Sequence, residues 1–235
     1  MNIRQKKILE AVIKEYVDTA QPVSSGALFK KHKSSASPAT LRAEMKRLEK
    51  EGYLYQPHTS AGRIPTDKGY RFFIDSLMTS KELTVREQDV LRKNLLPEKT
   101  IDHLMLKAAN ILADMSSNLA ISGVLDYNEP EFYKFGLGRL LKEPEFGYSS
   151  QLVEILDYLD RNVEELFDIV HDETIGVYIG EENPIKQMKG LSMIISGQRL
   201  KSGKRGLIAV LGPRRMKYDR NIALIEYIRN LLDHV

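Results

Sequence analysis

The stretch SPATLRAEMKRLEKE, residues 37–51, decides the fold of the first third of the chain. Ser37 is a residue type that caps helices, and proline is favoured at the first helical position because its missing N–H would be unpaired there. Apolar residues then recur at helical spacing and predict one buried face, made of Leu41, Met45 and Leu48. We therefore predict a helix from Pro38 to about Glu51.

The opposite face of this helix is small at its start and basic further along. It carries Ala39, Ala43, Lys46 and Lys50, flanked by Arg42 and Arg47. Short side chains allow a first helical turn to approach base edges in the DNA major groove, arginine can pair with guanine, and lysine neutralises phosphates. The alternative is an ordinary solvated lysine-rich face, so the neighbouring elements decide between the two.

Those neighbouring elements predict a winged helix-turn-helix. An amphipathic helix at about residues 4–19 is followed by a short one, capped by Ser24, that ends in the polar run 32–35. After the basic helix, residues 53–56 and 63–65 have the pattern of two strands joined by the polar turn 57–62. Thr66 then caps a fourth helix.

This arrangement predicts which residues contact DNA. We expect the recognition helix to place Thr40, Arg42, Lys46 and Arg47 in the major groove, with Ala39 and Ala43 permitting close approach. Hydroxyls suit phosphate contacts, and a hairpin of this kind reaches the backbone or minor groove. The remaining predicted contacts are Ser37, His58, Thr59, Ser60 and Arg63. His58 by itself does not make a metal site.

The charge distribution agrees with a polyanion-binding amino-terminal part. Residues 1–80 contain 14 Lys and Arg against 8 Asp and Glu, so the whole basic excess of the chain, which has a net charge of +3, lies there. Clustered cations drive phosphate binding. Ordinary surface variation would also give such a difference.

Beyond residue 80 the sequence predicts a second domain of the α+β class. Thr84 and Glu87 form a capping box for a helix in the linker 81–97. A longer helix follows, with a stripe that is either intramolecular core or a subunit seam: Ile101, Leu104, Met105, Ala108, Leu112, Met115 and Leu119. Next come a helix (151–170), strands (175–179, 191–196, 207–211) and a last helix (220–233), which predict an antiparallel sheet with flanking helices over 98–235.

Composition and motifs argue against catalysis, export and a membrane location. The chain has no cysteine, no apolar leader, and no apolar run long enough to span a bilayer, so we expect a cytoplasmic protein. Its five histidines form no helical i, i+4 pair, and its glycine-containing segments lack dinucleotide and phosphate-loop spacing. We expect no enzyme activity, no cofactor and no metal.

Five segments of the chain resemble the HrcA family of bacterial heat-inducible transcription repressors. They are residues 37–42 (SPATLR), 48–54 (LEKEGYL), 56–71 (QPHTSAGRIPTDKGYR), 179–183 (IGEEN) and 211–218 (LGPRRMKY). The resemblance implies a winged-helix head and a GAF-like body. It also implies a homodimer on an inverted-repeat operator upstream of chaperone genes, and stabilisation by a GroEL-type chaperonin.

Two departures from the family pattern stand out. Ala43 occupies a position that is usually Asn in the family's recognition helix, so any base contact of that Asn is absent. Between about Ser117 and Gly136, family members have a long extra segment that includes an inserted dimerisation domain, and this chain has only residues 118–135 there. We therefore expect a reduced GAF-like domain.

The leading hypothesis is a dimeric repressor of heat-shock genes that occupies its operator on double-stranded DNA. One alternative is a regulator whose carboxy-terminal domain binds a small metabolite. Another is an interaction protein that uses its winged helix to bind proteins instead of nucleic acid.

Overall fold

The computed structural model describes residues 1–32, 36–125, 130–146, 150–171 and 174–232. The chain divides into two compact units, Met1–Thr79 and Ser80–Val235. The first combines helices with a small sheet, and the second has a five-stranded antiparallel sheet with helices. The predicted α+β class is confirmed.

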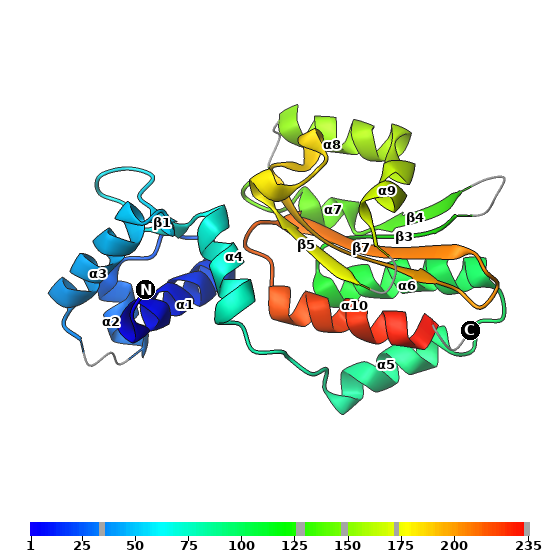
Figure 1. The fold of residues 1–235 in the computed structure, drawn as a ribbon, viewed down its shortest axis with the longest axis horizontal. Coiled ribbons are helices and arrows are strands. Elements are labelled where there is room, and N and C mark those ends of the chain that lie inside the picture. Colours follow the sequence, from blue (N-terminus) through cyan, green and yellow to red (C-terminus); the bar gives the residue numbers. More distant parts are fainter. Residues whose placement is uncertain (33–35, 126–129, 147–149, 172–173, 233–235) are drawn as a thin grey trace. The chain divides into compact units, whose positions relative to one another are not determined.

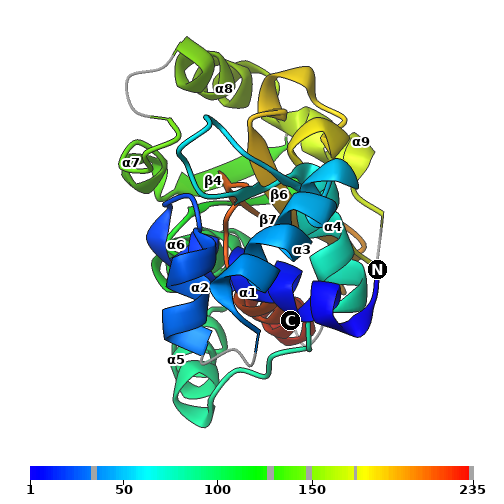
Figure 2. The ribbon, with the colours of Figure 1, turned by 90° about the vertical axis from the view of Figure 1, so that its left-hand side faces the viewer.

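The described residues of the N-terminal unit form four helices and a hairpin, in the predicted order. The helices are α1 (Ile3–Thr19), α2 (Ser25–His32), α3 (Pro38–Lys50) and α4 (Asp67–Ser76), and each is labelled in Figure 2. The predicted caps are present, because the side chains of Ser24, Ser37 and Thr66 accept N–H groups from the first turns of α2, α3 and α4. The far end of the polar run after α2, residues 33–35, lies outside the described residues.

The apolar face predicted for α3 forms the centre of this unit. Met45 and Leu48 are fully buried and Leu41 is nearly so. They lie with buried residues of the other elements, among them Leu9, Val12, Leu54 and Tyr70. Because this face of α3 is directed inward, its basic face is directed outward.

The hairpin strands are shorter than predicted. Strands β1 (Leu54–Tyr55) and β2 (Ile64–Pro65) have two residues each, against the predicted 53–56 and 63–65. Arg63 instead pairs with Val23 in an isolated antiparallel bridge, so the chain before α2 lies beside the hairpin.

The second unit is built on one antiparallel sheet in the order β4-β3-β7-β6-β5. Its strands are β3 (Leu119–Leu125), β4 (Glu131–Phe135), β5 (Ile175–Ile179), β6 (Leu191–Arg199) and β7 (Arg205–Pro213). The last three correspond to the three predicted strands. Strands β6 and β7 pair along their full length, from Leu191 opposite Pro213 to Arg199 opposite Arg205.

Helices cover both faces of this sheet (Figure 1). On one side lie α6 (Ile101–Ser116) and α10 (Tyr218–Leu232), with α5 (Val85–Leu95) packed on both. On the other lie α8 (Ser150–Arg161) and α9 (Leu166–Ile169). Short elements complete the unit: helix α7 (Leu137–Leu140) and the 3-10 helices η1 (Val163–Glu165), η2 (Gly180–Glu182) and η3 (Lys186–Met188). Residue 233, the predicted end of the last helix, lies outside the described residues.

The structure corrects two predictions in this unit. Strands β3 and β4, at residues 119–125 and 131–135, have no counterpart among the predicted strands. The predicted helix 151–170 is interrupted, because α8 ends at Arg161 and the chain continues through η1 into the short α9.

The apolar stripe of α6 belongs to the core of the chain. Leu104, Met105, Ala108 and Leu112 are buried within this single chain, and α6 packs on β3, β4, α5 and α10. Leu119, the last member of the predicted stripe, begins strand β3 instead. The structure therefore favours core over subunit seam for this face.

The segment expected to be a linker is part of the second unit. The capping box between Thr84 and Glu87 is present, and Leu91 and Leu95 of α5 are buried. Arg220 of α10 also lies 3.0 Å from the Glu87 carboxylate. None of the helices among the described residues is long and apolar enough to cross a membrane.

The capping box predicts a pH-dependent contribution to stability. Hydrogen bonds from Thr84 hold the pKa of Glu87 below its ordinary value of 4.5. Since folding lowers this pKa, the ionised Glu87 carboxylate stabilises the folded state above pH 4.5. This contribution is lost as the pH falls through the pKa of Glu87 in the folded protein. We expect Glu87→Gln to lower the free energy of unfolding by about 0.5 kcal/mol at pH 7, a small effect at a solvated site.

Urea unfolding of the parent and the Glu87→Gln variant, at about pH 7 and about pH 3, measures this contribution. The difference between their free energies of unfolding should be smaller at the lower pH. Glu82→Gln removes the same charge from an exposed residue outside the capping box and is the control. An unchanged difference between the two pH values would contradict the prediction.

Candidate nucleic-acid interface

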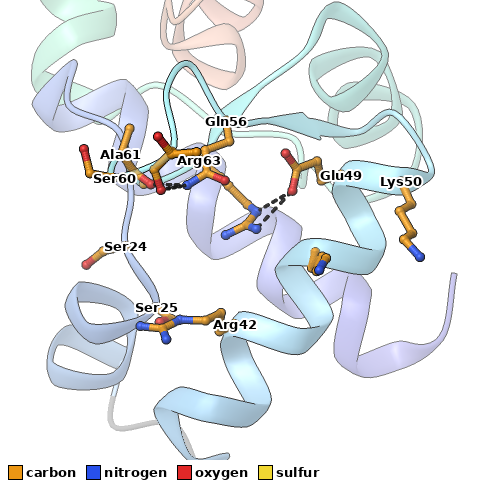
Figure 3. Close-up of a pocket in the computed structure, with 12 residues that line it drawn as sticks. Ser24, Ser25, Arg42, Glu49, Lys50, Gln56, Ser60, Ala61 and Arg63 are labelled. Atoms are coloured by element: carbon orange, nitrogen blue, oxygen red, sulfur yellow. Dashed lines mark hydrogen bonds and ion pairs between the residues drawn. The ribbon is translucent and has the colours of Figure 1, made fainter.

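The N-terminal unit has a cavity of about 780 Å3 between α3, the start of α2 and the hairpin loop (Figure 3). Four of the twelve residues that line it are Lys or Arg, and one is Glu. The lining residues are Ser24, Ser25, Arg42, Lys46, Glu49, Lys50, Gln56, Thr59, Ser60, Ala61, Gly62 and Arg63. A hollow with such a cationic excess attracts anions, phosphate groups included.

Helix α3 supplies most of the positive charge. Arg42 and Lys46 are four residues apart, so both side chains lie on one face, and both are exposed. Among the described residues, no ion pair is found for Arg42, Lys46 or Lys50, so their charges are available to an external partner. Figure 3 shows the Arg42 side chain extending from α3 toward Ser25 at the start of α2.

The other predicted residues of α3 lie around this face. Ala39 and Ala43 are exposed, as close approach to a ligand requires. Arg47 is further round the helix and does not line the cavity, and it pairs with the buried carboxylate of Glu44 at 3.0 Å. Its side chain remains 63% exposed, so one edge of the guanidinium can still meet solvent or a ligand.

The hydroxyl groups at the start of α3 contact one another. Ser37 Oγ lies 3.0 Å from Thr40 Oγ1 and also accepts the Thr40 N–H. Ser37 therefore caps the helix as predicted, and Thr40 is half-buried beside it. One of the two hydroxyls donates its single hydrogen to the other, so the accepting hydroxyl is the one that remains free to donate to a phosphate.

The hairpin loop is held by one side chain. Gln56 Nε2 donates to the carbonyl oxygens of Thr59 at 3.0 Å and Ala61 at 2.8 Å, which fixes the loop from within. At its tip, His58 Nδ1 lies 3.1 Å from Ser60 Oγ, and His58, Thr59 and Ser60 are all exposed. The loop thus presents three polar side chains on a tethered backbone.

Arg63 differs most from the sequence expectation. Its side chain is only 11% exposed, and it is directed at α3 instead of away from the hairpin. The Nε and Nη2 groups donate to one oxygen of Glu49, at 3.1 and 3.0 Å (Figure 3). Arg63 is an expected contact with DNA, and in the structure its guanidinium is held by Glu49.

Gly62 allows the hairpin to approach the chain before α2. A Cβ atom at this position would lie 2.4 Å from the carbonyl carbon of Val23 and 2.6 Å from that of Pro22, both of them backbone atoms. We expect Gly62→Ala to displace the hairpin and lower the free energy of unfolding by about 1–3 kcal/mol. Thermal or urea unfolding measures the change.

Gly26→Ala is the matched control for this substitution. Gly26 lies in α2, and the nearest atom to an added Cβ would be Ser24 Oγ at 3.9 Å. Alanine is favoured over glycine in helices, so this variant should be as stable as the parent or more stable. Equal losses of stability in both variants would show that the close approach at Gly62 is unimportant.

Sequence reasoning missed several residues of the interface. Glu49 lies seven residues after Arg42, a spacing that places both on one helical face and could have identified it. The role of Gln56 had no such indication, because its bonds to the loop depend on how the hairpin turns. No group of three or more possible metal ligands occurs among the residues that the structure describes.

An outward basic helix beside a hairpin, in a chain that also has a separate sheet-containing unit, is typical of DNA-binding transcription regulators. Residues 73–222 match the family model described as the HrcA protein C terminal domain. The chain belongs to the HrcA family of heat-inducible transcription repressors. Because this family consists of repressors, the chain is not an enzyme.

Curated relatives of the same family align with nearly the whole chain. It is 30% identical to the heat-inducible transcription repressor HrcA of Natranaerobius thermophilus, over 99% of this chain and 96% of the relative. It is 28% identical to the HrcA repressor of Gloeobacter violaceus, over 96% of this chain and 91% of the relative. The first alignment has 331 positions, 96 more than the 235 residues of this chain, so the relative contains residues with no counterpart here.

A solved structure shares the fold. A crystal structure described as a hypothetical protein at 2.2 Å resolution has a TM-score of 0.80 and 22% identity, and the match covers 100% of this chain and 98% of that one. At this identity the likeness concerns the fold alone.

Proposed function

We propose that this chain is a sequence-specific DNA-binding repressor of chaperone genes that acts as a homodimer on an inverted-repeat operator. The observation that supports it best is the cationic cavity between α3 and the hairpin, where Arg42, Lys46 and Lys50 have no ion-pair partner among the described residues. In this proposal the N-terminal unit is a winged helix-turn-helix with α3 as recognition helix. The second unit is a reduced GAF-like domain.

The proposed contacts divide between the two DNA grooves and the backbone. Helix α3 enters the major groove with Thr40, Arg42, Lys46 and Arg47, and the small Ala39 and Ala43 permit close approach of the backbone. Ser37 and Thr59 donate to phosphates, while His58 and Ser60 bring the hairpin tip to the backbone or minor groove. Since Ala43 has no polar group, discrimination of bases falls mainly on Arg42 and its neighbours.

Repression in this proposal is steric. The dimer occupies the operator and blocks transcription in the cytoplasm, and heat lowers the fraction of molecules able to bind DNA. A GroEL-type chaperonin, implied by the family, would raise that fraction again. An inverted repeat presents two equivalent half-sites, so a two-fold symmetric dimer matches it.

Binding to duplex DNA tests this function directly. A random pool of duplexes is passed over the protein, and the selected sequence is footprinted and compared with a random duplex of equal length at the same salt concentration. We expect the selected sequence to be an inverted repeat bound at least about 1,000-fold more tightly than random DNA. Equal affinity for both would overturn the proposal.

The mass of the protein in solution, with and without that DNA, tests the dimer separately. We expect two chains on each inverted repeat. A single chain on the full site would contradict the dimer while leaving sequence-specific binding intact.

A further inference from the structure

The pair formed by Arg63 and Glu49 joins the hairpin to the recognition helix. Both donor groups, Arg63 Nε and Nη2, reach one oxygen of the Glu49 carboxylate. A charge-assisted pair with two donors fixes the orientation of the guanidinium as well as its distance from the carboxylate. The Arg63 side chain is 11% exposed, so much of its surface is withdrawn from any ligand outside the protein.

Hydrogen bonds also hold the backbone of Arg63 and of the loop before it. The Arg63 N–H donates to Val23 O at 2.8 Å, and its carbonyl oxygen accepts from Val23 N–H at 2.9 Å. On the other side of the loop, Gln56 holds the carbonyl groups of Thr59 and Ala61. The side chain of Arg63 is therefore a short connection between a tethered loop and α3.

Glu49 is a single negative charge on a face that is otherwise basic. It lines the same cavity as Arg42 and Lys46, and its side chain is 31% exposed. An uncompensated carboxylate there would repel phosphates and lower the affinity for DNA. Arg63 cancels that charge within hydrogen-bond distance.

We propose that Arg63 is a positioning residue that acts on DNA through Glu49. It holds the hairpin loop in place beside α3 and neutralises Glu49, and it makes no essential contact of its own with DNA. This inference rests on the proposed function, because it assumes that α3 and the hairpin bind one duplex together.

A double-mutant cycle separates this role from direct contact. The proteins are the parent, Arg63→Ala, Glu49→Ala and the double variant, and the probes are the DNA selected by the parent and a random duplex of equal length. Arg63→Ala alone should lower affinity for the selected DNA about tenfold, since it frees the hairpin and exposes the Glu49 charge. In the Glu49→Ala background, Arg63→Ala should lower the affinity for the selected DNA less than about twofold.

Salt dependence provides a second readout, because loss of a direct phosphate contact changes it and loss of a positioning contact does not. The slope of log affinity against log salt is negative, and removal of one phosphate contact makes it shallower by about 0.9. We expect Arg63→Ala to leave the slope unchanged in the Glu49→Ala background. Equal reductions of affinity in both backgrounds, together with a shallower slope, would overturn the inference and make Arg63 a direct contact.

Arg63→Lys keeps the test decisive if the alanine variant unfolds. Lysine retains the charge but not the fork of two donors, so the pair with Glu49 is weakened while a simple phosphate contact would survive. We expect the preference for selected over random DNA to fall about threefold or more, with the salt slope retained. An unchanged preference would overturn the positioning role.

The two proposals fail in different ways. If the parent selects no sequence, the proposed specific repressor is wrong, and the same cycle measured on random DNA still reports whether Arg63 acts through Glu49. If selection succeeds and the two substitutions are additive, only the positioning role is wrong.

Discussion

Replacement of both Arg42 and Lys46 by alanine should lower the affinity for the selected DNA at least about 100-fold. Arginine paired to a base contributes about 1–3 kcal/mol of discrimination, and each tenfold change in affinity corresponds to about 1.4 kcal/mol. The two side chains lie on one exposed face of α3 and line the same cavity. Since no ion pair is found for either among the described residues, their removal should leave the free energy of unfolding nearly unchanged.

The salt dependence of binding distinguishes the two contributions. The negative slope of log affinity against log salt should become shallower by about 0.9 for each phosphate that the variant no longer neutralises. A base contact of Arg42 would instead appear as a smaller difference between selected and random DNA. Single substitutions measured by fluorescence anisotropy at several salt concentrations assign these roles to Arg42 and Lys46.

The matched control removes the same charge from the second unit. Lys93 and Lys142 are exposed, and replacing both by alanine lowers the net charge by two without touching α3 or the hairpin. We expect this control to bind DNA with affinity within about twofold of the parent. Equal reductions of affinity in the two double variants would mean that net charge, and not this face of α3, determines binding.

The fold of the N-terminal unit could be predicted because its determinants are local. The caps formed by Ser37 and Thr66 involve residues three apart in sequence, and the apolar spacing of α3 repeats within two turns. Arg63 marks the limit of such reasoning. Its partner Glu49 is 14 residues away, and only the three-dimensional course of the hairpin brings the two together.

The second unit was harder to predict because buried strands and buried helices have similar sequences. Residues 119–125, LAISGVL, are almost entirely buried and lack the alternation of a half-exposed strand. Leu119 also continues the helical spacing of α6, so periodicity alone could not find the boundary. The helix ends because Ser117 adopts a left-handed conformation with φ 59°, which is uncommon for a residue other than glycine.

The interruption between α8 and α9 has a similar explanation. Apolar residues keep helical spacing from Leu152 to Leu166, and both ends of that stripe are buried. Asn162 nevertheless leaves the helical conformation, with φ −131° and ψ 19°. Its side chain donates to Glu165, a local bond that competes with a continuous helix.

Truncation of the α6 core should have the largest effect on stability. Leu112 is fully buried, and α6 packs on the sheet and on two helices of the same unit. Leu112→Ala removes buried methyl groups and leaves a cavity, so we expect the free energy of unfolding to fall by about 2–5 kcal/mol. Urea unfolding at several protein concentrations measures this decrease, which should be the same at each concentration.

Leu106→Ala is the control, because it is the same chemical change on the same helix at a residue that is 36% exposed. Leu106→Ala should lower the free energy of unfolding by less than about 1 kcal/mol, since exposed positions tolerate truncation. If α6 were a subunit seam, Leu112→Ala would lower the mass in solution and its cost would vary with protein concentration. A constant decrease with unchanged mass would instead assign this face to the core, and the proposed two-fold interface would then have to use another surface of the chain.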